Sequence, residues 1–388
     1  MKQKNISFIK EDKCTGCYAC YSKCYRNAIT MVKNEEGFYY PSVDPDRCTS
    51  CGRCVSVCAS LKKREKNKRG DLYRANAKDL GIRERGSSGG IVELLSNEIL
   101  KTDGVVFGAA FSQTKKEIIH TSTNAVSLKK LLKSKYVQSQ INDSFTEIET
   151  ILKNGGTVLF SGTPCQVAGL KSFLGKEYNN LFTVDFICHG VPSPGLFSKM
   201  IEDLEEKHCS RLQEISFRSK ARGWRHSSTT ARYENGQIEN VPNREFVFYS
   251  LFLNDYSLRK TCYSCDYYCK HVSELTVADD WNVPAGIDDD TGMSLVFVNN
   301  DQGRGLFDRI VRQLNYTELD RDSIDLEAYK HVYSLKGRKE FFRDYRRLTY
   351  TDLQNKWVSK ATAKQKTMLA SIHYYCRRVR QRFKDQNR

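Results

Sequence analysis

The sequence lacks any run of eighteen apolar residues, so it offers no segment long enough for a membrane-spanning helix. Its N-terminus, MKQKNISFIKED, also lacks the apolar core of an export signal. These two absences predict a cytoplasmic location, and in that reducing compartment fifteen cysteines are better explained as metal ligands than as disulfides. A hydrophobic content of 39% over 388 residues is enough for two or three globular domains.

Acidic residues are scarce towards the C-terminus. From Lys336 to Arg388, sixteen Lys or Arg face four Asp or Glu, so this stretch supplies +12 of the net +16 and leaves +4 for the first 335 residues. A basic tail suits an anionic partner, such as an acidic electron carrier, a membrane surface or nucleic acid, and the alternative is a solvated helical face. Apolar residues between 368 and 379 recur at helical spacing, which predicts an amphipathic helix able to lie peripherally on the inner face of a membrane.

The most informative feature is a pair of cysteine runs, CTGCYACYSKC at 14–24 and CTSCGRCVSVC at 48–58. Both have the C-x2-C-x2-C-x3-C spacing of bacterial two-cluster ferredoxins, in which the fourth cysteine of each run ligates the other cluster. This spacing predicts two [4Fe–4S] clusters with crossed ligands. One would be held by Cys14, Cys17, Cys20 and Cys58, and the other by Cys48, Cys51, Cys54 and Cys24.

Zinc is the alternative for such runs, but a zinc site needs four ligands and has no use for the x3 cysteine. The proline that usually follows each run is missing, since Tyr25 and Ala59 stand there. Acidic–basic pairs precede both runs, at 12–13 and 46–47, which indicates an internal duplication. The intervening AITMVKNEEGFYYPSV predicts a hairpin that turns at 35–37. Residues 1–62 are therefore predicted to form a ferredoxin domain.

After a charged segment, interpreted as a linker over 63–85, SSGG at 87–90 opens a stretch of helical periodicity. Small residues at a helix N-terminus present free N–H groups, which suit a phosphate. Turns of this kind before helices are also common without any ligand. The sequence therefore gives this loop only a candidate role.

Three apolar runs, at 103–111, 157–160 and 182–187, predict buried strands, with the loop SGTPCQ and a helix to Leu174 between the last two. Such strand–helix–strand units are parallel and right-handed. Cys165 and Cys188 then follow the carboxyl ends of neighbouring strands, where open sheets bind ligands. With Cys262 and Cys265 they would form a third cluster site, Cys269 being a further candidate; buried free thiols are the alternative.

The order of these motifs resembles the coenzyme F(420) hydrogenase/dehydrogenase beta-subunit family. The resemblance spans residues 5–300 and rests on SSGG, KSKYVQSQI, FSGTPCQVAGL, DFICHGVPSPGLF, ISFRSKARGW, CYSC and ELTVADDW. It implies an α+β ferredoxin domain followed by an α/β flavin-binding domain with a mainly parallel sheet at 86–200. A second part with the CxxC pair would span 201–335, and a basic helical tail would follow at 336–388.

The resemblance also implies FAD and one or more [4Fe–4S] clusters as cofactors. The flavin-phosphate loop would be Ser87, Ser88, Gly89 and Gly90. Flavin or substrate contacts would come from Lys135, Tyr136, Gly162 and Thr163. Ligands of an additional cluster would be Cys165, Cys188, Cys262 and Cys265. His189 is a candidate proton donor, or equally a structural histidine, and Lys135 is a second candidate catalytic group.

These inferences favour an iron–sulfur flavoprotein oxidoreductase that takes electrons from a ferredoxin-like donor. The bacterial branch it resembles is often encoded among genes for surface polysaccharide synthesis, so we expect an organic, anionic, sugar- or lipid-linked substrate. In ISFRSKARGW, Arg218, Lys220, Arg222 and Arg225 would grip a phosphate, unless they form an ordinary basic strand. A non-catalytic electron-relay subunit is the alternative. A nucleic-acid-binding protein ranks third, because eight ferredoxin-spaced cysteines have no part in that function, and no nucleic acid is expected.

Overall fold

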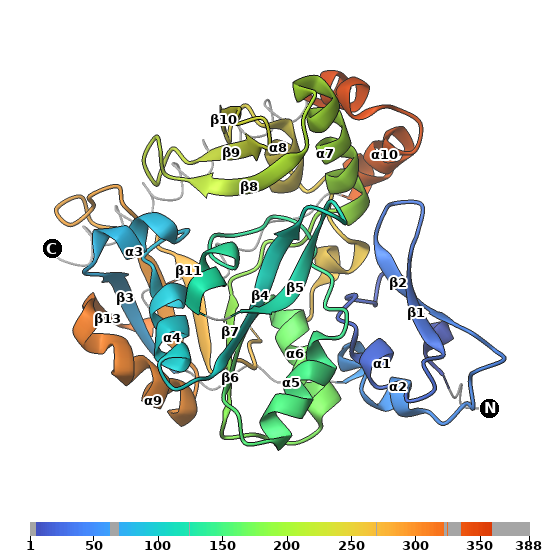
Figure 1. The fold of residues 1–388 in the computed structure, drawn as a ribbon, viewed down its shortest axis with the longest axis horizontal. Helices are drawn as coiled ribbons and strands as arrows, with labels where there is room; N and C mark the ends of the chain where they lie inside the picture. The colour runs from blue at the N-terminus through green and yellow to red at the C-terminus, as the bar shows by residue number, and fades with distance from the viewer. Residues whose placement is uncertain are drawn as a thin grey trace, which may run out of the picture.

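The computed structural model describes residues 5–62, 70–123, 125–268, 270–321, 324 and 335–358. Figure 1 shows three parts: a small N-terminal head, a central sheet with helices on both faces, and an upper module above one end of the sheet. Each part has its own apolar core. The candidate sites lie where these parts meet.

The head contains the predicted hairpin, in which β1 (Ile29–Lys33) pairs antiparallel with β2 (Tyr39–Val43). Its other elements are short: η1 (Ile6–Phe8), α1 (Ala19–Ser22), α2 (Arg53–Ser56) and η2 (Ala59–Leu61). Both α1 and α2 begin after a residue in the left-handed conformation, Tyr18 and Gly52 respectively, so the duplication seen in the sequence recurs in the backbone. Few apolar side chains fill this domain, which leaves its interior to the cysteines.

The central sheet has eight strands in the order β13-β3-β12-β11-β7-β6-β4-β5. They are β3 (Asp71–Ala77), β4 (Val105–Ser112), β5 (Glu117–Thr123), β6 (Val158–Ser161), β7 (Leu181–Phe186), β11 (Leu275–Asp279), β12 (Ser294–Val298) and β13 (Leu314–Leu319). The predicted parallel arrangement holds at the centre, where β4, β6, β7 and β11 run parallel. Antiparallel strands extend both edges, so the sheet as a whole is mixed.

The segment 63–85 is not only a linker. Asp71–Ala77 forms β3, which pairs with both β12 and β13, and α3 (Leu80–Arg85) follows it. Leu72, Ala75 and Ala77 are buried in this strand. The charged stretch before β3 hid a strand whose partners come more than 200 residues later in the chain, and residues 63–69 lie outside the described part.

Helices cover both faces of the sheet (Figure 1). α4 (Ile91–Leu100) and α9 (Asp301–Ile310) pack on one face, with η3 (Ala125–Lys130) and η5 (Val311–Gln313) nearby. α5 (Ser144–Lys153) and α6 (Pro164–Leu174) pack on the other, and this second layer also contacts α1 of the head. The predicted unit β6–α6–β7 is present, with Cys165 at the start of α6 and Cys188 just after β7.

The upper module consists of α7 (Pro194–His208), a sheet of β8 (Leu212–Ser219), β9 (Ser228–Tyr233) and β10 (Ile238–Pro242), α8 (Val247–Leu253), η4 (Lys260–Ser264) and α10 (Leu335–Tyr345). The boundary expected at 200/201 therefore falls inside α7. The chain also returns to the central sheet at β11, so the expected parts 86–200 and 201–335 share one sheet.

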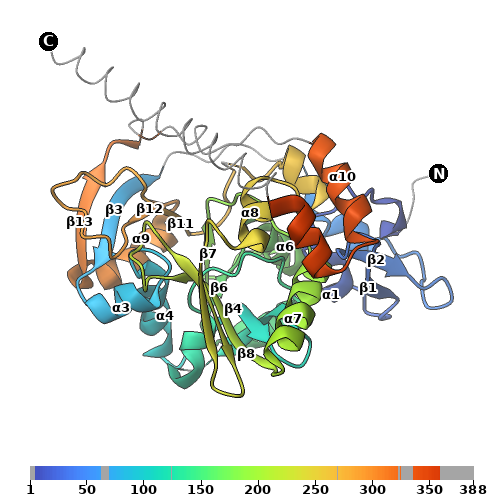
Figure 2. The same ribbon diagram turned by 90° about the horizontal axis from the view of Figure 1, so that it is seen from above.

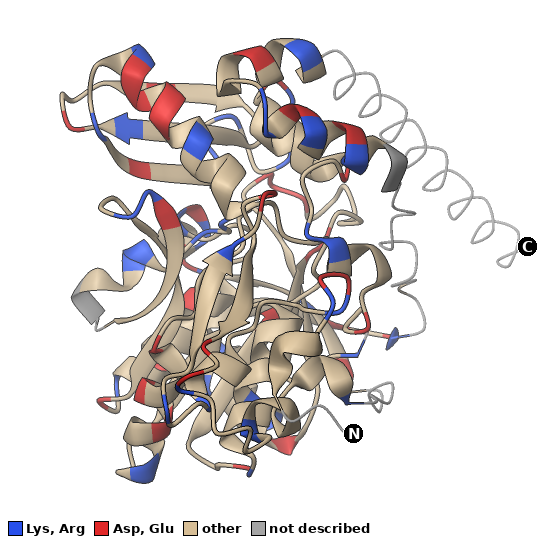
Figure 3. Cartoon of the chain, turned by 90° about the vertical axis from the view of Figure 1, so that its right-hand side faces the viewer, with Lys and Arg blue, Asp and Glu red and all other residues tan. Residues whose placement is uncertain are grey.

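The predicted basic tail, 336–388, is in its first part a folded element. Phe341, Phe342 and Trp357 are buried, and α10 lies beside α7 and the head hairpin (Figure 2). Residues 350–358 are also helical. The predicted amphipathic helix at 368–379 falls outside the described residues. None of the described helices combines the length and apolarity of a membrane span, and Lys and Arg are interspersed with Asp and Glu across the face seen in Figure 3.

Candidate cofactor sites

The head brings together Cys14, Cys17, Cys20 and Cys58, which we call the inner group. These four cysteines line one cavity of ≈ 330 Å³, together with residues of η1 and β1. Cys14 and Cys17 are buried, and Cys20 and Cys58 are half-buried. The crossed ligand set predicted from the spacing is therefore the set that the fold assembles at this cavity.

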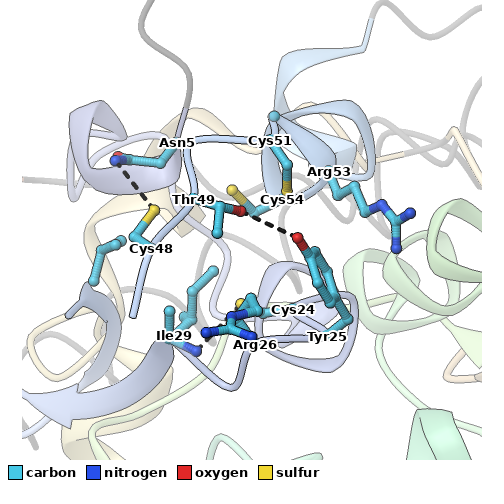
Figure 4. Close-up of a pocket in the computed structure, with 13 residues that line it drawn as sticks. Asn5, Cys24, Tyr25, Arg26, Ile29, Cys48, Thr49, Cys51, Arg53 and Cys54 are labelled. Carbon is cyan, nitrogen blue, oxygen red and sulfur yellow. Dashed lines mark hydrogen bonds between the residues drawn. The ribbon is translucent and has the colours of Figure 1, made fainter. Parts of the chain in front are cut away.

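Cys24, Cys48, Cys51 and Cys54, the outer group, line a second cavity of ≈ 350 Å³ (Figure 4). Cys51 is exposed, whereas the corresponding Cys17 of the inner group is buried. Neutral donors approach the sulfurs here: the Ala28 N–H lies 3.3 Å from Cys24 Sγ and the Asn5 amide 3.8 Å from Cys48 Sγ. The outer group therefore lies nearer to solvent than the inner group.

The donor chemistry of these groups fits iron–sulfur clusters. Burial, and then the neighbouring Cys17, raise the pKa of the Cys58 thiol to about 11, and burial with nearby cysteines raises the pKa of Cys20 well above its usual range. Four thiolates in such a place require a positive centre, which bound iron provides. No three His, Cys, Asp or Glu within the described ranges are arranged to hold a single metal ion. Four cysteines line each head cavity, which matches the number of ligands that a [4Fe–4S] cluster needs.

Cys165, Cys188, Cys262 and Cys265, the third group, come together from α6, the end of β7 and η4. Burial raises the pKa of Cys188 well above its usual range, and the charges of Cys262, Cys165 and Cys265 add to this effect. Burial raises the pKa of Cys262 to about 12, with Cys265 as the next cause. The four thiols predicted from distant segments are thus neighbours, while Cys269 lies outside the described residues.

The inner group touches the layer that holds the third group. Gly169 of α6 lies against Cys17, so closely that a Cβ added there would be 2.9 Å from Cys17 Sγ. The charge of Cys17 in turn contributes to the raised pKa of Cys165. The three cysteine groups therefore lie in series, from the exposed outer group through the inner group to the edge of the central sheet.

The SSGG loop occupies the N-terminal end of α4, as predicted. Gly90 is the N-cap, with φ +82° and no side-chain cap, so the first N–H groups of α4 have no side-chain partner at that position. A Cβ on Gly89 would lie 2.5 Å from Ala75 O, which explains why this residue must be glycine. Ser87 Oγ accepts the Ser134 N–H at 2.7 Å, and this bond joins the loop to the predicted KSKY segment.

Two buried cations stand at the same loop. Lys220 Nζ donates to Arg83 O, to Ser88 O at 2.8 Å and to Thr291 O at 2.7 Å, which uses all three of its hydrogens, and Arg218 donates to Ser87 O at 3.2 Å. Arg218 also pairs with Asp279 at 3.2 Å. Its Nε is buried and has no hydrogen-bond partner among the described atoms. A helix N-terminus beside an unsatisfied arginine donor, with Lys220 contributing its charge alone, fits the phosphates of a bound nucleotide cofactor.

Lys135 and Tyr136 lie beside this loop. Lys135 Nζ donates to Lys130 O at 3.0 Å and to Leu132 O, and burial lowers its pKa to about 7. Tyr136 packs among Tyr249, Phe252 and Phe217. Gly162 and Thr163 lie elsewhere, next to the third group. The Thr163 hydroxyl caps α6 and lies 3.1 Å from Cys165 Sγ.

His189 has a partner that the sequence did not reveal. Its Nε2 lies 2.9 Å from Asp255 Oδ1, and its ring meets Phe252 edge-on at 4.9 Å. A second acid–histidine pair, Asp185 with His271 at 2.9 Å, is buried at the end of β7. A single aspartate inside the apolar run FTVDFI was the only sequence signal for it. Both acids reach their histidines from segments more than 60 residues away, which sequence spacing cannot show.

The predicted phosphate grip in ISFRSKARGW divides in two. Arg218 and Lys220 are buried at the SSGG loop, whereas Arg222 and Arg225 are on the surface side. Arg225 donates to Asp288 at 2.7 Å. Trp224 is fully buried and stacks on Trp281 at 4.6 Å. Only Arg218 and Lys220 of this segment therefore lie at the SSGG loop.

Comparison with known proteins finds two family matches along the chain. Residues 155–322 match the family described as the C terminus of the coenzyme F420 hydrogenase/dehydrogenase beta subunit, and residues 13–61 match the 4Fe-4S dicluster domain. No curated protein matches the chain. A chain of the F420-reducing [NiFe] hydrogenase complex from Methanosarcina barkeri is similar at 16% identity and a TM-score of 0.46, covering 76% of this chain and 93% of that one.

The match at 13–61 covers both cysteine runs, which confirms the prediction of a dicluster head with two [4Fe–4S] sites. The match at 155–322 includes all four cysteines of the third group. Together the two matches indicate an iron–sulfur protein of the oxidoreductase class that takes part in electron transfer.

Proposed function

We propose that this chain is an iron–sulfur flavoprotein oxidoreductase that reduces an organic substrate with electrons received at the outer group. The observation that supports this most is the serial placement of the three cysteine groups, with Cys51 exposed at one end and Cys188 at the sheet edge. The path would run from the outer to the inner to the third group and then to a flavin held at the SSGG loop. Iron–sulfur clusters transfer electrons singly and a flavin can release them as a pair.

The donor would be a small acidic one-electron carrier of the ferredoxin type. The rim of the outer group presents Tyr25, which is 57% exposed, with the Arg53 guanidinium 4.8 Å from its ring centre, and exposed Arg26 beside it (Figure 4). Complementary charge mainly raises the rate of association. Changing Arg26 and Arg53 together to Glu should lower the second-order rate of reduction more than about tenfold and weaken its salt dependence. An unchanged rate would place the donor elsewhere.

The flavin would be FAD, with its phosphates at Gly90, Arg218 and Lys220. Gly89→Ala should lose the flavin, since the added methyl group would meet Ala75 O at 2.5 Å and push the loop outward. Gly305→Ala in α9 is the control, because no atom lies within 4 Å of a Cβ there and the residue is helical. Flavin extracted per chain is the measurement, and full retention by Gly89→Ala would contradict this placement.

Two groups are placed to move protons near the flavin. Asp255 holds the imidazole of His189 beside Cys188, and Lys135 has one Nζ hydrogen left after its two carbonyl bonds. A general acid works best with a pKa near the working pH, which suits Lys135. His189→Gln and Lys135→Met should each slow substrate reduction while leaving reduction of the flavin by the donor unchanged. Slower substrate reduction with an unchanged rate of flavin reduction would show that these residues deliver protons and do not take part in electron transfer.

The substrate would be an organic, anionic molecule of sugar- or lipid-linked type, received near Arg222 and Arg225. If it is lipid-linked, the basic segment beyond residue 358 would hold the protein at the inner membrane surface. Deleting 359–388 should then release the protein from anionic liposomes, with neutral liposomes as the control. Retained binding after the deletion would rule out this role of the segment.

A non-catalytic relay subunit is the second candidate, favoured by the description of the matched family as a beta subunit. One experiment separates the two functions. The anaerobic protein is mixed with reduced ferredoxin, and its flavin absorption is followed with and without added acceptors. Flavin reduction followed by acceptor-dependent reoxidation supports the enzyme. Reduced clusters with no flavin signal support the relay.

A further inference from the structure

Arg259 is a fully buried cation at the junction of the head and the body. Its exposed fraction is 0%. Nε donates to Cys14 O at 2.8 Å, and Nη2 lies 3.6 Å from Cys14 Sγ. Nη1 donates to Gln138 Oε1 at 2.9 Å, and Nη2 also donates to Tyr39 O at 3.0 Å. Its guanidinium therefore reaches a sulfur of the inner group directly.

The hydrogen bonds of Arg259 lead to no carboxylate. Every acceptor of this side chain among the described residues is a carbonyl, an amide oxygen or the thiol of Cys14. Glu11, whose charge interacts with that of Arg259, forms its hydrogen bonds instead with Lys260 and Asn34. Removing a charge from water is costly unless an opposite charge compensates it. The thiolates around the inner cavity are the counter-charge that the site offers.

The main chain of the same residue serves the third group. Arg259 O accepts the Cys262 N–H at 3.0 Å, and the Arg259 N–H donates to Val191 O at 3.0 Å, three residues after Cys188. A single residue thus bonds a ligand of the inner group through its side chain and positions a ligand of the third group through its backbone. Gly16 is required for this arrangement, since a Cβ there would lie 2.9 Å from Arg259 Nη1.

The outer group has no equivalent among the described residues. The donors to its sulfurs include the Ala28 N–H, the Asn5 amide and the backbone N–H of Ile6, all of which are neutral. Its nearby cations, Arg26 and Arg53, are exposed, where water and salt screen them. A buried cation with a bond to sulfur favours the more negative, reduced form of a cluster and so raises its potential. The two halves of the duplicated head therefore differ in their electrostatics.

We propose that Arg259 is the positioning residue that sets the direction of electron flow within the head. Its buried charge makes the inner group the stronger electron acceptor, so that one electron leaves the outer group, which is oxidised, and reduces the inner group, with no proton transferred. The inference rests on the proposed function and assigns the potential difference on which that function depends. Arg259→Gln removes the charge and keeps a hydrogen-bond donor, and Arg259→Lys keeps the charge.

The test is an anaerobic redox titration of the full chain followed by electron paramagnetic resonance. It uses a Cys48→Ala/Cys51→Ala background, so that the remaining head signal comes from the inner group. Arg259→Gln should lower the reduced-to-oxidised ratio at a fixed ambient potential at least about tenfold, which corresponds to 59 mV for one electron. Arg259→Lys should stay within about threefold of the parent. Lys260→Met, which removes the adjacent half-exposed cation, should also stay within that range.

Iron content is measured on every variant. If Arg259→Gln retains its iron and the midpoint potential of the inner group is unchanged, the inference is overturned. It is also overturned if Arg259→Lys shifts that potential as much as Arg259→Gln does. If Arg259→Gln loses its iron, the test depends on Arg259→Lys. A tenfold fall of its reduced-to-oxidised ratio at the same ambient potential would contradict a role for the charge. A parent protein without head iron would instead refute the proposed function. The two failures are therefore distinct.

Discussion

The two cysteine groups of the head derive from one repeated motif, yet the fold treats them differently. The inner group lies against α6 and Arg259, whereas the outer group opens to solvent at Cys51. Each cavity is lined by four cysteines, so the difference described here lies in the surroundings of the two groups. A duplicated motif can thus acquire two environments, one facing solvent and one facing the body, through the contacts that surround it.

The head is also packed closely against the body on the inner side, and several of these close contacts involve glycines. Gly169 meets Cys17, Gly16 meets Arg259, and the hairpin turn at Gly37 meets Gly195 at the start of α7. No such contact is seen at the outer group within the described residues. A fixed distance between the inner and third groups follows from this attachment.

The largest expected difference concerns the cysteines themselves. Cys20→Ser and Cys51→Ser should each remove about four iron atoms per chain, because each cysteine belongs to one cluster. Cys20→Ser should also lower the melting temperature of the whole chain, since the inner group is packed against the body. Cys51→Ser should leave the body as stable as in the parent. Iron analysis and calorimetry check this, and equal melting temperatures would contradict the comparison.

The attachment at the hairpin allows a matched pair of arginines to be compared. Arg338 is 2% exposed and makes a two-pronged ion pair with Glu36, one bond being 2.8 Å, whereas Arg346 forms an exposed pair with Glu35. Arg338→Met should lower the free energy of unfolding by about 3 kcal/mol, since it removes the two-pronged partner of a half-buried carboxylate, which then keeps only Lys260 at 3.8 Å. Arg346→Met should cost less than about 1 kcal/mol. Denaturant unfolding measures both, and similar losses would argue against the attachment.

A smaller effect is expected from two helical glycines. Gly169→Ala places a methyl group 2.8 Å from Cys17 Cβ and should destabilise the chain by about 1–3 kcal/mol through overpacking. Gly305→Ala in α9 meets nothing within 4 Å and should stabilise the chain by about 0.5–1 kcal/mol through helix propensity. Alanine favours a helix more than glycine at both positions. If the free energy of unfolding falls for Gly169→Ala and rises for Gly305→Ala, the difference is due to the contact with Cys17. The same sign for both would contradict close packing of the head.

The last comparison concerns Lys135, at the far end of the proposed path, where the expected effect per pH unit is small. Its pKa falls to about 7 in the folded chain, below the value near 10.4 of an unfolded lysine. Between these values the unfolded chain binds a proton that the folded chain lacks, so stability should rise with pH over this range. Relative to Lys135→Met, we expect a rise of about 1 kcal/mol per pH unit between about pH 7 and 10. If the free energy of unfolding varies with pH in the same way in the parent and in Lys135→Met, Lys135 is not desolvated in the folded chain.

Local spacing predicted much of this structure. The two cysteine runs gave the crossed ligand sets, and the apolar runs at 103–111, 157–160 and 182–187 correspond to β4, β6 and β7. Such patterns depend on neighbours a few residues apart. The SSGG loop was predicted for the same reason, since its helix follows immediately in the chain.

Features that depend on distant partners were missed. β3 was interpreted as linker because its partners, β12 and β13, lie more than 200 residues away. Arg259 contacts Cys14, which lies 245 residues earlier in the chain. The local sequence LRKTC does not indicate that the Arg259 side chain is buried. Asp255 is likewise paired with His189 only by the fold. Charged residues placed by tertiary structure remain the part that sequence patterns do not reveal.

The most direct measurement of the central claim is the cofactor content of the full chain purified without oxygen. Three cysteine groups in series with a flavin predict about twelve irons, about twelve sulfides and one flavin per chain. Zinc in the head, or thiols without iron, would contradict the account at its base. Eight irons per chain would mean that only two clusters are present, so that the third group would hold no cluster and would not take part in electron transfer.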